Sequence, residues 1–172
     1  MERQRIIKFS GNNITLIGNE VKVGEKAPKF QLINSELKIL SSENYEGKIK
    51  VFSVFTSIDT EVCEYQVTWF NNEIAKYDNT VLLNISVDLP FALERFCSAN
   101  NIKNSLVLSD YRDLDFGMKY GFVIKELRLL SRGIIIVDEE DIIRYVEYVN
   151  ELTDEPKYEL AMDILKKIGG GN

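Results

Sequence analysis

The chain has 172 residues, of which 45% are hydrophobic and 28% are charged, and its formal net charge is −6. These proportions are typical of a soluble globular protein and exclude disordered and fibrous classes, and the length predicts one domain over residues 1–172 with a sizeable core. The negative charge and the lack of a basic stripe argue against binding to nucleic acid or to an anionic membrane.

The first predicted element is an N-terminal β-hairpin. Residues 6–9 and 14–17 form short apolar stretches, and Gly18-Asn19 is a two-residue turn signal that precedes a further stretch at 20–23. Such a hairpin has two interpretations, as plain scaffold or as a roof over an active site, and the sequence leaves both open.

Two shorter elements follow the hairpin. Residues 27–32 are expected to be extended, because Pro28 biases the residue before it away from a helical conformation. The polar run 41–47 indicates a short helical turn that ends at Gly47 and leads into the next strand.

The centre of the chain alternates strands and helices. β-branched and aromatic residues dominate 51–55, which is too short for a helix, and apolar residues dominate 81–87, so both stretches are predicted to be buried strands. Apolar residues at intervals of three and four indicate an amphipathic helix over about 60–77. A second helix is expected to begin near Pro90, with Cys97 late in it. This order predicts an α/β fold with parallel strands joined by right-handed crossovers.

The C-terminal third is predicted to complete the sheet and to cover it. The sequence of residues 113–120 is compatible with a helix. The apolar runs 133–137 and 142–146 flank an acidic turn, which indicates a β-hairpin. A last amphipathic helix opens at 153–156 and is expected to pack on the sheet, and 169–172 are expected to form a frayed tail.

What the chain lacks excludes several function classes. The sequence contains no histidine, which excludes a Ser-His-Asp or Cys-His catalytic pair and histidine metal ligands. Its two cysteines alone cannot close a structural zinc site, so we expect no metal. The apolar runs are too short to span a membrane, and residues 1–5 are not followed by a long apolar signal core. We therefore expect a cytoplasmic protein whose cysteines, if they pair, do so reversibly.

Cys63 lies in a polar turn between the strand 51–55 and the helix that begins near Thr60. The first turn of a helix offers unpaired backbone N–H groups and the positive end of the helix dipole, which both favour an anion. Because the thiolate is the nucleophilic form of cysteine, this position indicates a reactive residue, activated by the helix terminus, a hydroxyl and a cation. The alternative is that Cys63 is a small buried hydrophobic residue, which is the commoner case.

A set of short motifs runs through the chain in a fixed order. They are Ala27-Pro28 with Phe30 and Leu32, the run from Ser57 to Cys63, Asp88-Leu89-Pro90-Phe91, Arg95-Phe96-Cys97, Asp115-Phe116-Gly117 with Tyr120-Gly121, and Ser131-Arg132-Gly133. Over about residues 13–168 this ordered set resembles the thiol peroxidase branch of the peroxiredoxins, the atypical two-cysteine type. The resemblance implies a thioredoxin-like (peroxiredoxin) fold of the α/β class, with a central mixed sheet flanked by helices and an N-terminal β-hairpin.

The resemblance also implies a role for each residue of the site. Cys63 would be the peroxidatic cysteine, which attacks the peroxide, and Cys97 would be the resolving cysteine. Thr60 would orient the peroxide and the sulfur through its hydroxyl, and Arg132 would place a cation beside the thiolate. Without the resemblance, an arginine at the start of a strand is more often a solvated charge.

The function implied by the resemblance is that of a thiol-dependent peroxidase, which reduces hydrogen peroxide and organic hydroperoxides without a cofactor. Its cycle would pass through a cysteine sulfenic acid and an intramolecular Cys63–Cys97 disulfide, which thioredoxin or a similar dithiol would reduce. Because the two cysteines lie on different predicted helices, disulfide formation is expected to need a local opening. The resemblance further implies a homodimer.

The chain departs from the family at Thr56, where peroxiredoxins usually carry proline. Threonine restores a backbone donor and removes the fixed φ of proline, so a more mobile or more hydrated loop is expected.

Two alternatives to the enzyme stay open at this point. The first is a non-enzymatic peroxide sensor, or redox relay, of the same fold, which would be oxidised stoichiometrically but would not sustain turnover with a thioredoxin system. The second is a structural thioredoxin-fold module in which both thiols are buried, and in which Cys63 would alkylate slowly even at pH ~8.

Overall fold

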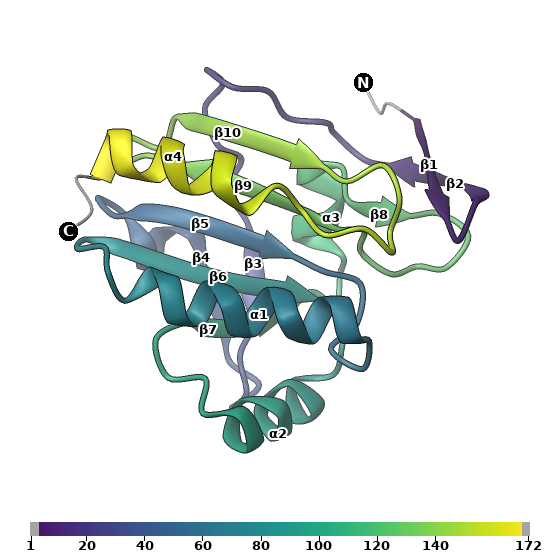
Figure 1. Ribbon diagram of the computed structural model, residues 1–172, viewed down its shortest axis with the longest axis horizontal. Helices are drawn as coiled ribbons and strands as arrows, with labels where there is room; N and C mark the ends of the chain where they lie inside the picture. The colour runs from purple at the N-terminus through teal and green to yellow at the C-terminus, as the bar shows by residue number, and fades with distance from the viewer. Residues whose placement is uncertain (1–3, 170–172) are drawn as a thin grey trace.

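The computed structural model describes residues 4–169, which form a seven-stranded mixed sheet, a three-stranded sheet and four α-helices (Figure 1). The strands are β1 (Arg5–Phe9), β2 (Asn12–Ile17), β3 (Gln31–Ile33), β4 (Ile39–Ser41), β5 (Ile49–Val54), β6 (Thr80–Ser86), β7 (Leu106–Ser109), β8 (Val123–Ile124), β9 (Gly133–Val137) and β10 (Ile143–Tyr148). The helices are the 3-10 helix η1 (Ser42–Tyr45) and the α-helices α1 (Glu61–Ile74), α2 (Pro90–Asn100), α3 (Asp115–Tyr120) and α4 (Tyr158–Gly169).

The large sheet has the strand order β10-β9-β5-β6-β7-β3-β4. Strands β5, β6 and β7 are parallel, whereas β9 pairs antiparallel with β5 and with β10. The helices α1 and α2 form the crossovers between the parallel strands. These pairings confirm the predicted α/β class, the mixed sheet and the C-terminal hairpin. No helix within the described part of the chain is long and apolar enough to cross a bilayer.

Strand β5 lies in the interior of the sheet, between β9 and β6, and all of its residues are buried. Its side chains alternate between the two faces, as the period of two residues in a strand requires. Ile49 and Val51 pack toward α1 and α4, which cover one face (Figure 1). Phe52 and Val54 point to the opposite face, on which α3 packs. Each fully buried aliphatic or aromatic side chain stabilises the fold by about 1.5–3 kcal/mol.

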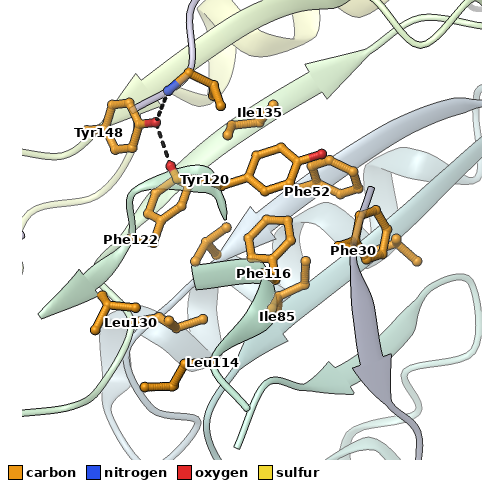
Figure 2. Close-up of a cluster of buried hydrophobic side chains, with 14 of the residues drawn as sticks. Phe30, Phe52, Ile85, Leu114, Phe116, Tyr120, Phe122, Leu130, Ile135 and Tyr148 are labelled. Atoms are coloured by element: carbon orange, nitrogen blue, oxygen red, sulfur yellow. Dashed lines mark hydrogen bonds between the residues drawn. The ribbon is translucent and has the colours of Figure 1, made fainter. Parts of the chain in front are cut away.

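An aromatic cluster fills the face under α3 (Figure 2). Phe52 meets Phe30 and Phe116 edge to face, each with ring centroids 5.3 Å apart, and Phe116 stacks on Tyr120 at 4.4 Å. The hydroxyl of Tyr148 donates to the carbonyl of Tyr120 at 2.7 Å, which ties β10 to the end of α3. Edge-to-face and offset pairs are favoured by the ring quadrupoles, so this cluster fixes α3 and the segment before β3 on the sheet.

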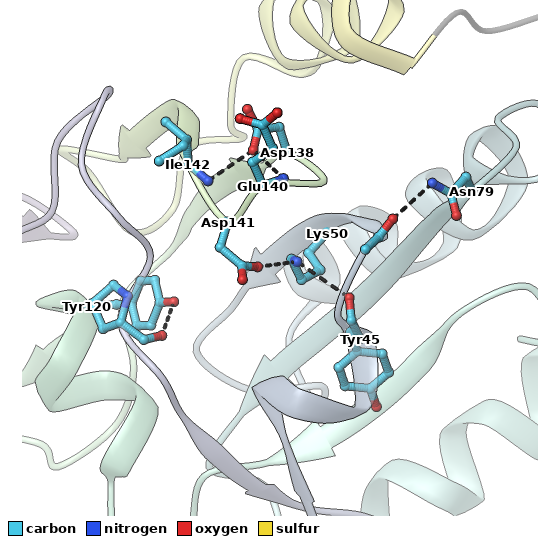
Figure 3. A network of polar contacts seen from close by, with 10 residues as sticks. Tyr45, Lys50, Asn79, Tyr120, Asp138, Glu140, Asp141 and Ile142 are labelled. Carbon is cyan, nitrogen blue, oxygen red and sulfur yellow. Dashed lines mark hydrogen bonds and ion pairs between the residues drawn. The ribbon is translucent and has the colours of Figure 1, made fainter.

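A polar network closes the amino end of β5, opposite the end from which the chain leads to α1 (Figure 3). The buried ammonium of Lys50 lies 2.6 Å from the carboxylate of Asp141, and it also donates to the carbonyl of Tyr45 at 3.4 Å. A buried cation needs such partners. This network links β5 to the β9–β10 turn and to η1, and we interpret it as structural.

The N-terminal hairpin is confirmed, but the predicted turn is wrong. Strands β1 and β2 pair with Phe9 opposite Asn12, so the turn lies at Ser10-Gly11. Gly18 serves a different purpose, because it has φ +111° and a Cβ there would lie 2.5 Å from the Met118 carbonyl oxygen. The glycine therefore allows a close approach to α3, and 20–23 do not form a strand.

Two predicted helix boundaries also differ. α1 ends at Ile74 and not near Tyr77. α4 begins at Tyr158 and not at 153–156, because residues 151–154 form a turn in which the Asp154 amide donates to the carbonyl of Glu151. Gly169 ends α4 instead of fraying, and the rest of the predicted tail lies outside the described residues.

Candidate active site

The turn between β5 and α1 places Cys63 in the first turn of a helix. α1 begins at Glu61, with Thr60 as its N-cap in an extended conformation. Cys63 is the third residue of this helix, and its side chain is fully buried. The backbone N–H groups of a first turn lack intrahelical acceptors, and the helix dipole is positive there. The predicted position of Cys63 at the start of a helix is confirmed.

Asp88, just beyond the end of β6, holds this turn in place. One carboxylate oxygen accepts a hydrogen bond from the Ser57 hydroxyl at 2.9 Å, and the other accepts the Ile58 amide at 2.8 Å. The Ser86 hydroxyl donates to the same second oxygen at 2.7 Å. Because both carboxylate oxygens are used, the loop before Cys63 is anchored to the neighbouring strand. Asp88 belongs to one of the sequence motifs, but only the tertiary structure shows that its side chain anchors the loop before Cys63.

The guanidinium of Arg132 lies against the sulfur of Cys63. Arg132 is only 2% exposed, and its Nη2 donates to Cys63 Sγ at 3.2 Å. Nη1 donates to Gln66 Oε1 at 2.9 Å, while Nε and Nη2 reach the carbonyl of Leu152 at 3.1 and 3.0 Å. Among the described residues Arg132 forms no salt bridge with a carboxylate. A buried cation without a carboxylate favours an anionic partner, and the guanidinium donates directly to the Cys63 sulfur.

Gln66 orients this arginine, and the sequence analysis did not identify it. It lies one turn after Cys63 on α1, and it is fully buried. Its Nε2 donates to the Ser53 hydroxyl at 2.7 Å and to the Val54 carbonyl at 3.2 Å, while its Oε1 accepts from Arg132. A polar residue three positions after Cys63, on the apolar face of the predicted helix, was the signal that could have revealed it.

A pocket of about 230 Å³ opens beside this arrangement. Thr56, Thr60 and Arg132 line it together with Leu152, and the remaining lining residues are Phe9, Glu61, Val62 and Thr153. The Thr60 hydroxyl donates to the carbonyl of Ser57 at 3.0 Å, which leaves its oxygen able to accept a further hydrogen bond. Phe9 comes from β1, so the N-terminal hairpin contributes one residue to the wall of the pocket.

Cys97 lies on α2, in the same apolar cluster as Cys63. The cluster joins α1 and α2 through buried residues that include Val67, Leu93 and Phe96, and Cys97 packs against it half-buried. Both cysteines are reduced in the structure. Burial, with a smaller effect of the nearby Glu94 carboxylate, raises the pKa of the Cys97 thiol to about 11.

The geometry therefore joins Cys63 directly to Arg132 and places Thr60 on the adjoining pocket, with Cys97 in the neighbouring helix. Residues 22–162 of this chain match the model of the protein family described as Redoxin. A thiol peroxidase of Listeria innocua is 47% identical over 161 residues, which cover 94% of this chain and 98% of that protein. The chain belongs to the thiol peroxidase family. A thiol peroxidase of Halalkalibacterium halodurans is 46% identical, covering 93% of this chain and 96% of its own.

Solved structures show the same fold. A peroxiredoxin-like protein from Aquifex aeolicus superposes with a TM-score of 0.89 at 35% identity, covering 95% of this chain and 97% of its own. A thiol peroxidase from Chromobacterium violaceum superposes with a TM-score of 0.84, covering 94% of this chain and 95% of its own; its 21% identity bears on the fold alone. The predicted thioredoxin-like (peroxiredoxin) fold is confirmed. As a thiol peroxidase family member, the protein is a thiol-dependent oxidoreductase of the peroxiredoxin type, as predicted.

Proposed function

We propose that this thiol peroxidase reduces hydrogen peroxide and organic hydroperoxides with Cys63 as the peroxidatic cysteine and Arg132 as the cation beside its thiolate. The observation that carries the proposal is the hydrogen bond of 3.2 Å from the buried Arg132 guanidinium to Cys63 Sγ in the first turn of α1. A helix terminus and an adjacent arginine are the features that make a cysteine nucleophilic when no histidine is available.

The chemical step transfers one oxygen atom to sulfur. The Cys63 thiolate attacks the terminal oxygen of the hydroperoxide, an S–O bond forms, and the O–O bond breaks. The sulfur is oxidised by two electrons to a sulfenic acid, and the departing alkoxide or hydroxide takes up a proton and leaves as an alcohol or water. Donors that face the oxygens matter because both oxygens gain negative charge as the O–O bond lengthens.

Thr60 and Arg132 both position the hydroperoxide, each through a different interaction. The Thr60 hydroxyl already donates to the Ser57 carbonyl, so its oxygen is free to accept the O–H of the hydroperoxide. Arg132 shares the pocket and supplies positive charge next to the sulfur. A preorganised donor such as the Arg132 guanidinium is worth about 3 kcal/mol in the transition state.

Cys97 completes the cycle as the resolving cysteine. Its thiol attacks the sulfenic acid of Cys63, which forms the Cys63–Cys97 disulfide and releases water. Disulfide geometry requires Cα atoms within about 7 Å, so α1 and α2 must approach or partly unwind for this step. Thioredoxin or a similar dithiol then reduces the disulfide by exchange and is itself oxidised.

The pH dependence of disulfide formation tests this opening. Because the pKa of Cys97 is raised to about 11 from about 9, the neutral thiol stabilises the packed state of α2 below pH 9 and this stabilisation is lost toward pH 11. We expect the rate of disulfide formation after one equivalent of peroxide, measured by quenched-flow alkylation, to rise about tenfold per pH unit from pH ~7 toward pH ~11, because the packed state, in which the pKa of Cys97 is raised, is the resting state. A rate that levels off near pH ~9 would instead mean that α2 already lies open before Cys97 reacts.

We further infer a homodimer of single-domain subunits, each spanning residues 1–172, in the cytoplasm. The resemblance to the two-cysteine peroxiredoxins supports the dimer. Two cysteines in a chain of 172 residues are not a disulfide scaffold, which suits a reducing compartment in which a disulfide forms only during a catalytic cycle.

A coupled peroxidase assay tests the function as a whole. With thioredoxin, thioredoxin reductase and NADPH, we expect sustained NADPH oxidation with hydrogen peroxide and with cumene hydroperoxide, because the cycle returns both cysteines to thiols. The control omits thioredoxin and should stall after about one equivalent of peroxide per subunit. A stall at one equivalent with the full system would favour the peroxide sensor over the peroxidase.

A further inference from the structure

The loop of residues 57–60, which leads into the helix of Cys63, has one polar tether to the rest of the fold. Its Ser57 hydroxyl and its Ile58 amide both donate to the carboxylate of Asp88, at 2.9 and 2.8 Å. The other hydrogen bonds of the loop stay within it or run to α1. Among the described residues, Asp88 is therefore the only hydrogen-bond partner of the loop outside α1.

The contacts on either side of this tether do not replace it. Thr56, which precedes the loop, is only 7% exposed, so the loop is not opened to solvent at that point, and its hydroxyl has no hydrogen-bond partner among the described residues. The buried side chain of Ile58 packs in the apolar cluster between α1 and α2. Apolar packing has no preferred direction, so the bonds to Asp88 determine where the loop lies.

The main chain of Asp88 is itself held rigidly. Its amide donates to the Ser86 hydroxyl at 3.2 Å, and its carbonyl accepts from the Ser109 hydroxyl at 2.5 Å. These serines are the last residues of β6 and β7, and both are fully buried. Because Asp88 is fixed to two strands in the interior of the sheet, breaking its bonds to the loop frees the loop and leaves the carboxylate in place.

The tether also joins the two segments that carry the cysteines. Asp88 lies two residues before Pro90, at which α2 with Cys97 begins, and the tethered loop leads directly to Cys63. In the tethered loop, the Ser57 carbonyl accepts the hydroxyl of Thr60, which lines the pocket. A disulfide between the two cysteines requires Cα atoms within about 7 Å, so the loop or α2 must move for it.

We propose that the bonds of Asp88 to Ser57 and Ile58 form a latch, which is closed while Cys63 reacts with the hydroperoxide and open while the Cys63–Cys97 disulfide forms. This inference rests on the proposed function and makes Asp88 a positioning residue for it. The closed latch keeps Thr60 on the pocket wall, whereas the open latch lets Cys63 leave its buried position. Asp88 exchanges hydrogen bonds only, and the disulfide step still forms one S–S bond and releases one water.

Asp88→Asn tests the latch, because asparagine has the same size but carries only one acceptor oxygen and no charge. Hydrogen bonds to a charged acceptor are the stronger ones, so we expect the latch to open about tenfold more often. Disulfide formation after one equivalent of peroxide, measured by quenched-flow alkylation, should therefore be about tenfold faster at pH ~7. The peroxide reaction should be about threefold slower, because Thr60 is held less firmly. Fluorescence of Trp69, the single tryptophan, follows it in stopped flow.

A second variant changes the latch from the loop side. Ser57→Ala removes the hydroxyl that binds Asp88 and keeps the carbonyl that binds Thr60. It should speed disulfide formation and slow the peroxide reaction, as Asp88→Asn does, but by smaller factors, because the Ile58 amide still binds the carboxylate. This variant also keeps the inference testable if Asp88→Asn does not fold.

Asp138→Asn is the matched control. Its carboxylate also binds two backbone amides and a side chain, namely Glu140, Ile142 and Arg144, but it does not line the pocket. This variant should lower Tm as Asp88→Asn does, because both lose a charged acceptor. Both of its rates should stay within about twofold of those of the natural protein.

Amide hydrogen exchange, measured by NMR on the natural protein, observes the latch directly. The Ile58 amide is bound to Asp88 in the reduced protein, so it should exchange slowly there. In the disulfide form we expect its exchange to be at least about tenfold faster.

Three results would overturn the inference. The first is an Asp88→Asn variant, or in its absence a Ser57→Ala variant, in which disulfide formation is not accelerated, since a purely structural residue would produce that result. The second is the same pair of opposite rate changes in Asp138→Asn, and the third is equal protection of the Ile58 amide in both redox forms. The proposed function would survive each of them, because it fails only if Cys63→Ser still reduces peroxide.

Discussion

Replacement of Cys63 by serine is expected to abolish peroxide reduction, with a loss of at least about four orders of magnitude in the second-order rate constant. Serine has nearly the shape of cysteine and fits the fully buried position. Its hydroxyl, however, is not ionised near neutral pH, and it cannot form a sulfenic acid. Consumption of hydrogen peroxide by the purified variant, with the full thioredoxin system present, measures the effect.

Cys97→Ser is the matched comparison, because it removes a thiol from the neighbouring helix and leaves the site of attack intact. We expect this variant to consume about one equivalent of peroxide per subunit at the natural rate and then to stall, because the sulfenic acid has no resolving thiol. Sustained turnover by Cys63→Ser would refute the assignment of the peroxidatic cysteine. Sustained turnover by Cys97→Ser would refute only the assignment of the resolving cysteine.

Replacement of Arg132 by lysine is expected to slow the reaction with peroxide about 100-fold, which corresponds to about 2.7 kcal/mol in the barrier. The guanidinium contacts the Cys63 sulfur, Gln66 and the Leu152 carbonyl at the same time. A lysine ammonium keeps the charge but cannot reproduce this planar set of donors. Because buried acceptors are left unpaired, Tm should fall as well.

Arg144→Lys is the control for this substitution. Arg144 lies in the C-terminal hairpin, where its half-exposed side chain pairs with the nearly buried Asp138, and neither residue lines the pocket around Thr60. Its replacement should change the peroxide rate by less than about twofold, because it leaves the pocket and Cys63 untouched. If stopped-flow fluorescence gave an unchanged rate constant for the reaction of Arg132→Lys with peroxide, Arg132 would have no part in that reaction.

Local patterns predicted most of the elements. The β-branched runs became β5, β6 and β9, because such runs find enough burial only in the interior of a sheet. Pro90 indeed opens α2, since proline lacks an N–H that the first helical position does not need. The hairpin turn was misplaced because a glycine signals positive φ or close packing equally well, and Gly18 is used for packing against α3.

The sequence by itself determined the class of fold, the position of Cys63 at a helix start and the exclusion of histidine chemistry, because these follow from residue type and local spacing. Only the tertiary structure decided that Gln66 holds Arg132 against the sulfur and that Asp88 anchors the loop. It alone revealed the unpaired hydroxyl of Thr56. The physical reason is that hydrogen bonds between residues distant in sequence depend on how strands and helices pack, and no local pattern encodes them.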